Sequence, residues 1–198
     1  MADITGLLLA AGASTRFGAN KLTAPLDGRA MLLHAARALS PCDRIVVVVR
    51  EGEDELQSLL QSAGLQTVTN EQAWRGMGSS IACGVSASQG SDGWCILPAD
   101  MPRVSRDTTQ RIVHALRNGA ALVAPYYQHR RGHPVGFNKE FATSLAALKG
   151  EVGARSLVER HQDTLLRIET NDAGVVVDVD TAPELARLEQ AWISIPPA

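Results

Sequence analysis

The chain has 198 residues, of which 45% are hydrophobic and 20% are charged, and its formal net charge is −2. This length suits one domain with a sizeable core, and so small a charge excludes an extended field for nucleic acid or a membrane surface. The three cysteines include no Cys-x-x-Cys pair, which argues against a disulfide framework and a zinc site.

We expect a single domain over residues 1–192, followed by a frayed tail at 193–198. The cysteine pattern fits a reducing compartment, and no basic leader precedes the first apolar run. No apolar stretch approaches the ~18 residues of a membrane span. The sequence therefore predicts a cytoplasmic protein with neither a membrane nor a nucleic-acid partner.

Strand-like and helix-like patterns alternate along the chain. Predicted strands cover residues 4–11, 44–50, 65–69, 93–99, 120–125, 165–169 and 174–179, and predicted helices cover 30–39, 53–63, 81–88, 106–118, 139–148, 154–161 and 183–192. The run 44–50 is almost entirely β-branched, which is typical of a strand covered on both faces. Residues 126–137 are expected to form a hairpin or crossover at the sheet edge. The alternation predicts an α/β fold with three layers around a doubly wound, mostly parallel sheet.

The first predicted strand runs into a loop of small residues that ends in two cations, Arg16 and Lys21. Small residues let backbone N–H groups approach a ligand, and the two cations can neutralise a triphosphate. The alternative is an ordinary strand-to-helix turn with solvated surface charges. The loop lacks the Gly-Lys-Ser/Thr of a Walker loop, and the spacing of Gly12 and Gly18 differs from a dinucleotide-binding fingerprint.

Two further candidate segments lie in the middle of the chain. Residues 76–80, Gly-Met-Gly-Ser-Ser, form a second small-residue loop whose glycines allow a flat base to approach, while Ser79 alternatively caps the following helix. Asp100 follows the predicted strand 93–99 and is expected at the carboxyl edge of the sheet, where ligands bind in open α/β folds. There it can hold Mg²⁺ against substrate phosphates, or cap the helix that begins near Ser105.

Residues 129–137 combine basic and turn residues around His133. The neighbouring Gly132, Pro134 and Gly136 indicate a tightly specified backbone, so that His133 is either a site residue or part of a structural turn. The basic residues 129–131 either form a solvated tip or clamp an anionic second substrate.

The last candidate site residues are two carboxylates near the end of the chain. Asp178 and Asp180 share one side of the predicted strand that ends near them, so both can point into one site. The alternative is that Asp180 or Thr181 caps the last helix, in which Pro183 is expected at the first position.

Five segments, in order along the chain, match one family. Residues 9–21 match the pattern Leu-Ala-Ala-Gly-x-Ser-x-Arg-Met/Phe-Gly-x-x-Lys without a gap, and Gly-Met-Gly-Ser-Ser (76–80), Ala-Asp-Met-Pro (99–102), Gly-His-Pro (132–134) and Asp-Val-Asp-Thr (178–181) follow. The chain resembles a MobA-like nucleotidyltransferase over nearly its whole length, and is most similar to the molybdenum cofactor cytidylyltransferase (MocA-like) branch. The resemblance implies a Rossmann-like fold of the nucleotide-diphospho-sugar transferase type.

The resemblance also implies roles for single residues. A nucleoside triphosphate would lie over the first loop, with Arg16, Lys21 and Asp100 as catalytic residues. Asp100 and Asp180 would hold Mg²⁺, with Asp178 as a helper. The implied nucleotide contacts are Leu9, Ala10, Ala11, Gly12, Ser14, Arg16, Lys21, Gly76, Ser79, Ser80 and Asp100, and the implied acceptor contacts are Gly132, His133, Pro134 and Arg155.

The implied reaction transfers CMP from CTP to the phosphate of a molybdopterin-type cofactor and releases pyrophosphate. CTP is favoured because residues 9–12 read Leu-Ala-Ala-Gly, whereas a GTP-using branch is expected to carry Leu-Ala-Gly-Gly. The alternatives are transfer to a sugar phosphate or methylerythritol phosphate, and a non-catalytic protein that delivers the cofactor to a molybdenum hydroxylase apoenzyme. A Rossmann oxidoreductase is disfavoured, because Arg50 stands where an acidic residue would bind ribose.

Overall fold

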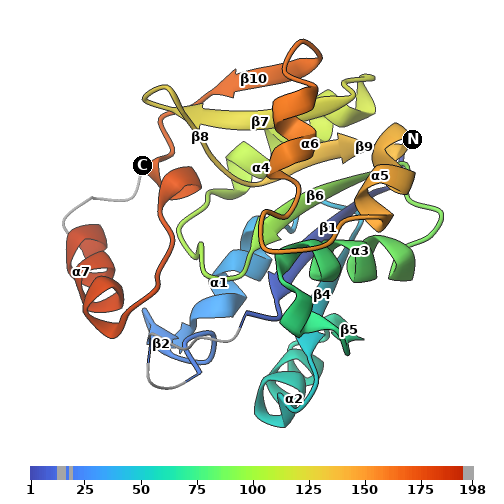
Figure 1. The fold of residues 1–198 in the computed structure, drawn as a ribbon. Coiled ribbons are helices and arrows are strands. Elements are labelled where there is room, and N and C mark those ends of the chain that lie inside the picture. The colour runs from blue at the N-terminus through green and yellow to red at the C-terminus, as the bar shows by residue number, and fades with distance from the viewer. Residues whose placement is uncertain (13–16, 18–19, 194–198) are drawn as a thin grey trace.

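A central sheet of eight strands carries helices on both of its faces (Figure 1). The computed structural model describes residues 1–12, 17 and 20–193. The strands run in the order β10-β7-β9-β6-β1-β4-β5, and β8 pairs with β7. A separate two-stranded ribbon joins β2 to β3. The predicted α/β fold with three layers is confirmed.

The secondary-structure elements have the following bounds. The strands are β1 (Ile4–Ala10), β2 (Pro25–Leu26), β3 (Arg29–Ala30), β4 (Arg44–Arg50), β5 (Gln66–Asn70), β6 (Gly93–Pro98), β7 (Leu122–Tyr127), β8 (Arg130–Arg131), β9 (Val135–Asn138) and β10 (Leu165–Glu169). The α-helices are α1 (Met31–Ala38), α2 (Asp54–Ser62), α3 (Met77–Ala87), α4 (Arg106–Arg117), α5 (Ala142–Ala146), α6 (Arg155–Arg160) and α7 (Ala182–Ile193), and the 3₁₀ helices are η1 (Ala73–Arg75), η2 (Lys139–Phe141) and η3 (Ala173–Val176). Within the described residues, no helix combines the length and apolar character needed to cross a membrane.

Most strand pairs in the sheet are parallel. β1 pairs in parallel with both β4 and β6, β4 pairs with β5, and β7 pairs with β10. The segment 126–137, expected as a hairpin or crossover at the sheet edge, supplies two antiparallel strands, β8 beside β7 and β9 between β6 and β7. The expected edge position is therefore wrong for β9, because it pairs with a strand on each side inside the sheet. Because β1, β4, β5 and β6 share one direction, their carboxyl ends meet at one edge of the sheet, which is where ligands bind in open α/β folds.

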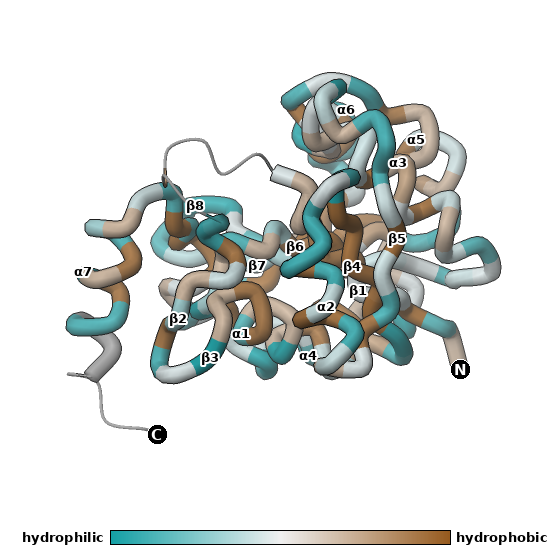
Figure 2. The backbone as a smooth tube through the Cα atoms, turned by 90° about the horizontal axis from the view of Figure 1, so that it is seen from below, coloured by the Kyte–Doolittle hydropathy of each residue, from teal (hydrophilic) through white to brown (hydrophobic). Residues whose placement is uncertain are grey.

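β1 shows how the apolar sequence builds the core. Leu8 and Ala10 belong to the core cluster shared with α1 and α4, whereas Leu7 belongs to the cluster shared with α3, α5 and α6. Successive side chains point to opposite faces of a strand, so the apolar run is buried on both sides. Figure 2 shows hydrophobic segments along β1 and β4. The continuous apolar runs in the sequence are thus those of interior parallel strands.

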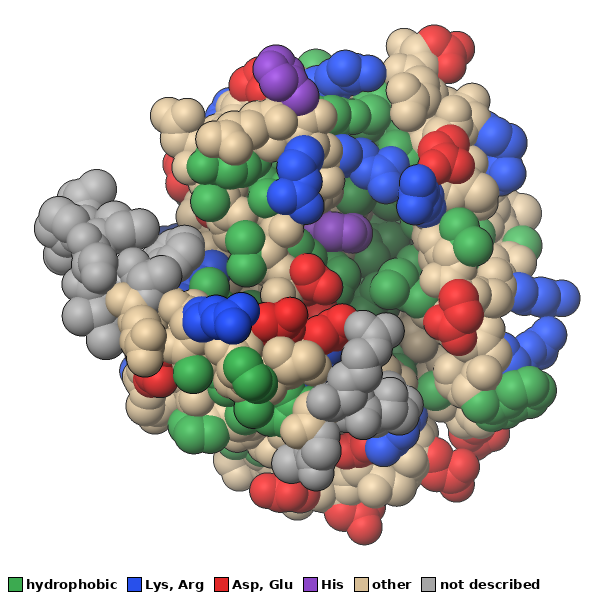
Figure 3. All heavy atoms as spheres, turned by 60° about the vertical axis from the view of Figure 1, so that its left-hand side comes forward, with side chains coloured by type: hydrophobic (Ala, Val, Ile, Leu, Met, Phe, Trp, Pro, Cys, Tyr) green, Lys and Arg blue, Asp and Glu red, His purple; other side chains and the backbone are tan. Residues whose placement is uncertain are grey.

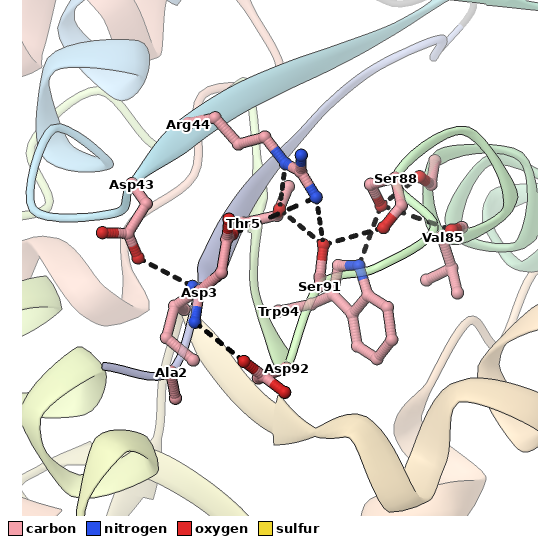
Figure 4. Close-up of polar contacts among 12 residues, drawn as sticks. Ala2, Asp3, Thr5, Asp43, Arg44, Val85, Ser88, Ser91, Asp92 and Trp94 are labelled. Atoms are coloured by element: carbon pink, nitrogen blue, oxygen red, sulfur yellow. Dashed lines mark hydrogen bonds and ion pairs between the residues drawn. The ribbon is translucent and has the colours of Figure 1, made fainter.

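A network of buried hydroxyl groups holds the amino-terminal edge of the sheet (Figure 4). Arg44, at the start of β4, donates from Nε to Thr5 Oγ1 and from Nη2 to Ser91 Oγ, each over 2.8 Å. Thr5 and Ser91 contact each other over 2.7 Å, and Trp94 Nε1 donates to Ser88 Oγ over 2.9 Å. These hydroxyl groups belong to buried residues, where an unmade hydrogen bond is costly. The network ties together the starts of β1, β4 and β6, opposite the edge where the strands end.

The second small-residue loop differs from its prediction. α3 begins at Met77, earlier than the predicted residue 81, because the chain turns at Gly76, whose φ is +91°. Ser79 therefore lies in the first turn of α3 and does not cap it. Its hydroxyl donates instead to the carbonyl oxygens of Gln72 and Gly76.

Two other predicted elements are corrected. Residues 174–179 are not a strand, because Asp172 accepts a hydrogen bond from Gly174 N and the chain then forms η3 before it extends. The predicted helix 139–148 is shorter and divided, with η2 leading into α5. The pattern of apolar residues in the sequence did not distinguish these short 3₁₀ turns from a strand or a continuous helix.

The last helix begins with a capping box. α7 begins at Ala182, so Pro183 occupies its second position and not its predicted first. Glu184 Oε2 accepts from the backbone N–H groups of Asp180 and Thr181 over 2.8 and 2.9 Å, while Thr181 Oγ1 accepts from Glu184 N. Thr181 is therefore the capping side chain, and the Asp180 carboxylate contacts Lys21. The tail predicted at 193–198 lies, from residue 194 on, outside the described residues.

Candidate active site

A cavity of about 590 Å³ opens at the carboxyl ends of the parallel strands. It is lined by Leu9 in β1 and Ala11 and Gly12 after it, by Arg50 at the end of β4 and Glu51 after it, by Asn70 at the end of β5 and Glu71, Ala73, Trp74, Gly76, Met77 and Ser80 beyond it, and by Pro98, Asp100 and Glu151. A cavity of this size accommodates a small ligand. The strand directions thus place the start of the first predicted loop, the second predicted loop and Asp100 around a single space.

Apart from Lys21, the predicted nucleotide contacts divide into three groups. Six of them line the cavity: Leu9, Ala11, Gly12, Gly76, Ser80 and Asp100. Ala10 is buried within β1, and the Ser79 hydroxyl is engaged with backbone carbonyls. Ser14 and Arg16 lie outside the described residues.

Lys21 connects the two carboxylates that the sequence singled out. Its Nζ donates to Asp100 Oδ2 over 2.9 Å, to Asp180 Oδ1 over 2.9 Å and to the carbonyl oxygen of Val179 over 3.0 Å. Lys21 is only 8% exposed, so all three of its ammonium protons are used inside the protein. The structure thus brings Lys21, Asp100 and Asp180 together as one junction, although 159 positions separate Lys21 from Asp180.

The electrostatics of this junction favour an ionised lysine. Burial alone would lower the pKa of the Lys21 ammonium, but the hydrogen bonds and charges of Asp100 and then Asp180 outweigh it and raise that pKa above its usual value. Burial raises the pKa of Asp100, while Lys21 opposes that rise and the charge of Asp178 adds to it. The ionised form of Asp100 therefore depends on a cation beside it.

The donor set suits a hard divalent cation. Asp100 and Asp180 direct carboxylate oxygens to one position, and Mg²⁺ commonly binds one or two carboxylates together with substrate phosphates and water. Among the residues that the structure describes, no group of three or more His, Cys, Asp or Glu side chains is arranged to hold a metal. The pair fits an ion whose remaining ligands come from a phosphate substrate, and the Lys21 ammonium lies between the two carboxylates in this structure.

Asp178 lies beside this junction on an extended segment. The backbone of the buried Val179 anchors the segment, because its N–H donates to the carbonyl oxygen of Asp100 over 2.9 Å. Asp178 is exposed, yet its charge adds to the rise in the pKa of Asp100 and opposes the fall in the pKa of His133. The structure thus joins Asp180 directly to Lys21 and leaves Asp178 as a nearby charge.

The glycines of the second loop serve packing. A Cβ at Gly78 would lie 2.7 Å from the carbonyl carbon of Lys149, and one at Gly76 would lie 2.7 Å from Glu151 N. Gly78 N donates to Gly150 O over 2.8 Å. The expectation that these glycines admit a flat base is corrected in part: they admit the backbone of residues 149–151, and Gly76 also lines the cavity.

Asn70 fixes the cavity wall at the end of β5. Its Nδ2 donates to Ser79 Oγ and Ser80 Oγ over 3.0 and 3.1 Å, and its Oδ1 accepts from Gln72 N over 3.0 Å. Asn70 is 5% exposed, so these bonds are made away from water. It holds the start of α3 against the turn that precedes it.

A polar bridge fixes the end of the first loop. Glu53 accepts from Asn20 Nδ2 over 2.7 Å with one oxygen and from Arg50 Nε with the other. Asn20 Oδ1 in turn accepts from Leu22 N over 3.2 Å. The bridge sets the backbone on both sides of Lys21, and it explains why a cation, Arg50, stands at the end of β4.

The predicted acceptor turn has a tightly fixed backbone. Gly132 N donates to Pro125 O and His133 N donates to Val175 O, each over 2.8 Å. A Cβ at Gly132 would collide with the carbonyl oxygen of Val175, so only glycine fits there. Pro134 is buried. Arg155 lies on α6, where its exposed side chain pairs with Glu159 over 2.8 Å.

His133 is held neutral. Burial, followed by the charge of Arg131, lowers the pKa of His133 to about 4, against the opposing influence of the Ile96 carbonyl and Asp178. Its Nδ1 atom is buried and has no hydrogen-bond partner among the described residues. A buried polar atom without a hydrogen-bond partner destabilises the folded protein. A hydrogen bond from a ligand to Nδ1 would remove this cost and so favour binding.

The face that carries the site is hollowed, with opposite charges on its two sides (Figure 3). Acidic side chains gather along one edge of the hollow, and Lys and Arg side chains gather along the other. Such an arrangement provides ligands for a cation on one side and attraction for anionic groups on the other.

Several cavity residues were missed by the sequence analysis. Arg50 ends β4 and Glu51 follows it, and Asn70 ends β5 and Glu71 follows it. The strand-end rule that selected Asp100 would have selected them too, had it been applied to every parallel strand. Trp74 carried a weaker signal, a tryptophan in a turn otherwise rich in small and polar residues.

The geometry defines an α/β protein with a cavity and a lysine–carboxylate junction at the edge of its sheet. Residues 6–165 match the family model of the MobA-like NTP transferase domain, so the chain belongs to this family of nucleotidyltransferases. The resemblance drawn from the sequence is thereby confirmed.

Curated relatives cover almost the whole chain. Nicotine blue oxidoreductase of Paenarthrobacter nicotinovorans is 28% identical, with the alignment covering 93% of this chain and 96% of that protein. Purine catabolism protein PucB of Bacillus subtilis is 30% identical (95% and 97%), and the molybdenum cofactor guanylyltransferase of Burkholderia ambifaria is 30% identical (94% and 95%). The family therefore includes relatives concerned with the molybdenum cofactor.

Solved structures share the fold. Rv0371c of Mycobacterium tuberculosis H37Rv superposes with a TM-score of 0.85 at 24% identity, covering 96% of this chain and 98% of that one. A complex of Rv0371c with manganese superposes with a TM-score of 0.80 at 22% identity, covering 96% and 99%. These similarities establish the Rossmann-like fold.

The lowered pKa of the partly buried His133 predicts a dependence of stability on pH. Its pKa of about 4 in the folded state lies below the ordinary value near 6.5, so below pH ~6.5 the unfolded chain binds a proton that the folded protein does not. This contribution to the free energy of unfolding is complete above pH ~6.5 and falls by about 2 kcal/mol by pH 5.

Urea unfolding at pH 7 and pH 5 measures this effect. The loss of stability between the two pH values should be smaller in His133→Asn than in the wild type. His129→Asn, at an exposed position in the same region, should behave like the wild type. An equal loss in all three proteins would show that His133 does not titrate as described.

Proposed function

We propose that this protein transfers CMP from CTP to the phosphate of a molybdopterin-type cofactor, with a divalent cation, Mg²⁺, and with release of pyrophosphate. Membership of the nucleotidyltransferase family and its relatives concerned with the molybdenum cofactor support the reaction class. The observation that carries the proposal is the junction at the cavity, where Lys21 lies 2.9 Å from both Asp100 and Asp180.

Asp100 and Asp180 would hold the cation, with Asp178 beside them. The bound ion supplies neutralisation of charge on the phosphate oxygens. The manganese complex of Rv0371c supports a divalent ion in a protein of this fold. When a triphosphate enters, Lys21 exchanges its two carboxylate partners for phosphate oxygens, and Arg16 is expected to bind phosphate from the same loop.

The chemistry requires no nucleophile from the protein. An oxygen of the acceptor phosphate, already ionised at neutral pH, forms a bond to the α-phosphorus of CTP in line with the bond that breaks to the departing pyrophosphate. The chain's part is to position the two substrates and to stabilise charge on the reacting oxygens. Asn70 and Glu53 support this by fixing the two loops around the cavity.

The residues that line the cavity favour a pyrimidine base that carries an amino group. The Ala11 methyl group occupies space that the glycine of a GTP-using loop would leave open, which favours the smaller base. Glu51, Glu71 and Glu151 also line the cavity, and their carboxylate oxygens are able to accept a hydrogen bond from the N4 amino group that cytosine offers and uracil lacks.

The acceptor is assigned to the turn at residues 132–134. The unpartnered Nδ1 of the neutral His133 can bond to a polar ring edge, and Gly132 and Pro134 fix its backbone. The basic edge of the hollow suits an anionic acceptor, and Arg155 is a further predicted contact (Figure 3). A molybdenum hydroxylase apoenzyme is the expected recipient of the product.

Pyrophosphate release tests the proposal. Purified protein with Mg²⁺ is assayed with CTP, GTP, ATP and UTP, each in the presence of a molybdopterin-type acceptor or of sugar 1-phosphates. Release with CTP and the pterin acceptor is the expected result. Pyrophosphate release with a sugar phosphate only would show that the acceptor belongs to another class. Binding of CTP without release of pyrophosphate would favour a cofactor-delivery protein.

Replacing Asp100 separates catalysis from binding. In Asp100→Asn the side chain keeps its size but loses the charge that the reaction needs, so kcat should fall about a hundredfold or more. The dissociation constant of CTP, measured without metal, should change by much less. Asp107→Asn, at an exposed position on α4, is the matched control. A loss of binding as large as the loss of kcat would contradict this role.

A further inference from the structure

Trp74 is the most exposed large hydrophobic side chain beside the cavity. It is 81% exposed, whereas Trp94 in β6 is 2% exposed. Trp74 lines the cavity together with Ala73, Gly76 and Met77. Burial of the large apolar ring of tryptophan is favourable, and an indole that is exposed to water lacks this stabilisation. An exposed indole at the mouth of a cavity therefore indicates a surface that a ligand covers.

The backbone that carries Trp74 is firmly braced. Gly76 N donates to Ala73 O, and Gly150 N donates to Arg75 O, each over 3.0 Å. On the other side, the turn is held by the bond from Gln72 N to Asn70 Oδ1. The ring is therefore presented from a rigid η1 turn, which is the arrangement that lowers the entropic cost of stacking on a ligand.

Arg75 adds a cation next to the ring. Its guanidinium carbon lies 5.9 Å from the centroid of Trp74, and its Nη1 donates to Gln72 Oε1 over 2.7 Å. The contact leaves most of the indole uncovered, as its exposure shows. A flat ring can therefore still approach Trp74.

The position of Trp74 in the cavity indicates which part of a nucleotide would contact it. Phosphates are assigned to the end at Asp100, which Lys21 contacts, while the segment from Asn70 to Met77 forms another part of the lining. A nucleotide with its phosphates at Asp100 would direct its base toward that segment. The described residues that line this cavity do not include Gly132 or His133, where the acceptor is assigned.

We propose that Trp74 stacks on the base of the bound nucleotide and closes the mouth of the cavity. This inference rests on the proposed function and adds a nucleotide-binding residue to it. Stacking on an aromatic side chain tolerates every base, because every base has a π-face. Trp74 therefore contributes affinity, while the choice of base is left to the polar residues of the lining.

Nucleotide binding by variants tests the role of Trp74. Titration calorimetry with CTP, UTP and ATP in the presence of Mg²⁺ compares the wild type, Trp74→Ala, Trp74→Phe and Val152→Ala. Loss of the ring should weaken binding of all three nucleotides by a similar factor, on the order of tenfold or more. The phenylalanine should restore most of the affinity. Val152, which is 61% exposed and does not line the cavity, supplies the matched apolar control.

Fluorescence provides a second readout. CTP should quench the emission of the wild type, and most of this quenching should be absent in Trp74→Phe. Unchanged affinity in Trp74→Ala, or normal nucleotide binding with a raised KM for the acceptor, would overturn the inference and leave the proposed function intact. Failure of the wild type to bind any nucleotide would overturn the proposed function itself.

Discussion

The ammonium of Lys21, held between Asp100 and Asp180, is the interaction on which the site depends. It joins three segments that are distant in the sequence: the loop after β1, the end of β6 and the segment before α7. A partly buried carboxylate such as Asp100 is stabilised by a cation beside it, and a buried lysine needs carboxylates. Each partner therefore accounts for the presence of the others, and a phosphate substrate with its metal ion can satisfy the same charges in another arrangement.

The rest of the fold positions this junction. Parallel pairing brings the ends of β1, β4, β5 and β6 to one edge, while the Arg44 and Thr5 network secures the opposite edge. Around the junction, Asn70 braces the start of α3 and Glu53 braces the loop that carries Lys21. The side chains of the junction consequently project from a braced framework, as the proposed catalysis by positioning and electrostatics requires.

The sequence predicted the fold class and the individual members of the junction, because buried strands and strand-end carboxylates have local signatures. It did not predict that Lys21 would contact Asp180, since that pairing depends on the path of the chain across 159 positions. Local patterns also misassigned Gly78, whose missing side chain admits the backbone of residue 149 and not a ligand. Trp74 was missed because its significance comes from exposure at a cavity, which only the folded chain reveals.

The most direct test of the central claim is the binding of Mn²⁺ measured by electron paramagnetic resonance, with and without CTP. Without nucleotide, Lys21 competes for Asp100 and Asp180, so the wild type should bind Mn²⁺ weakly and Lys21→Met should bind it more tightly. CTP should tighten binding in the wild type. Lys139→Met, which removes an exposed lysine paired with Asp92, controls for the change in net charge. Equal Mn²⁺ affinity in the wild type and Lys21→Met, with no effect of CTP, would contradict the account.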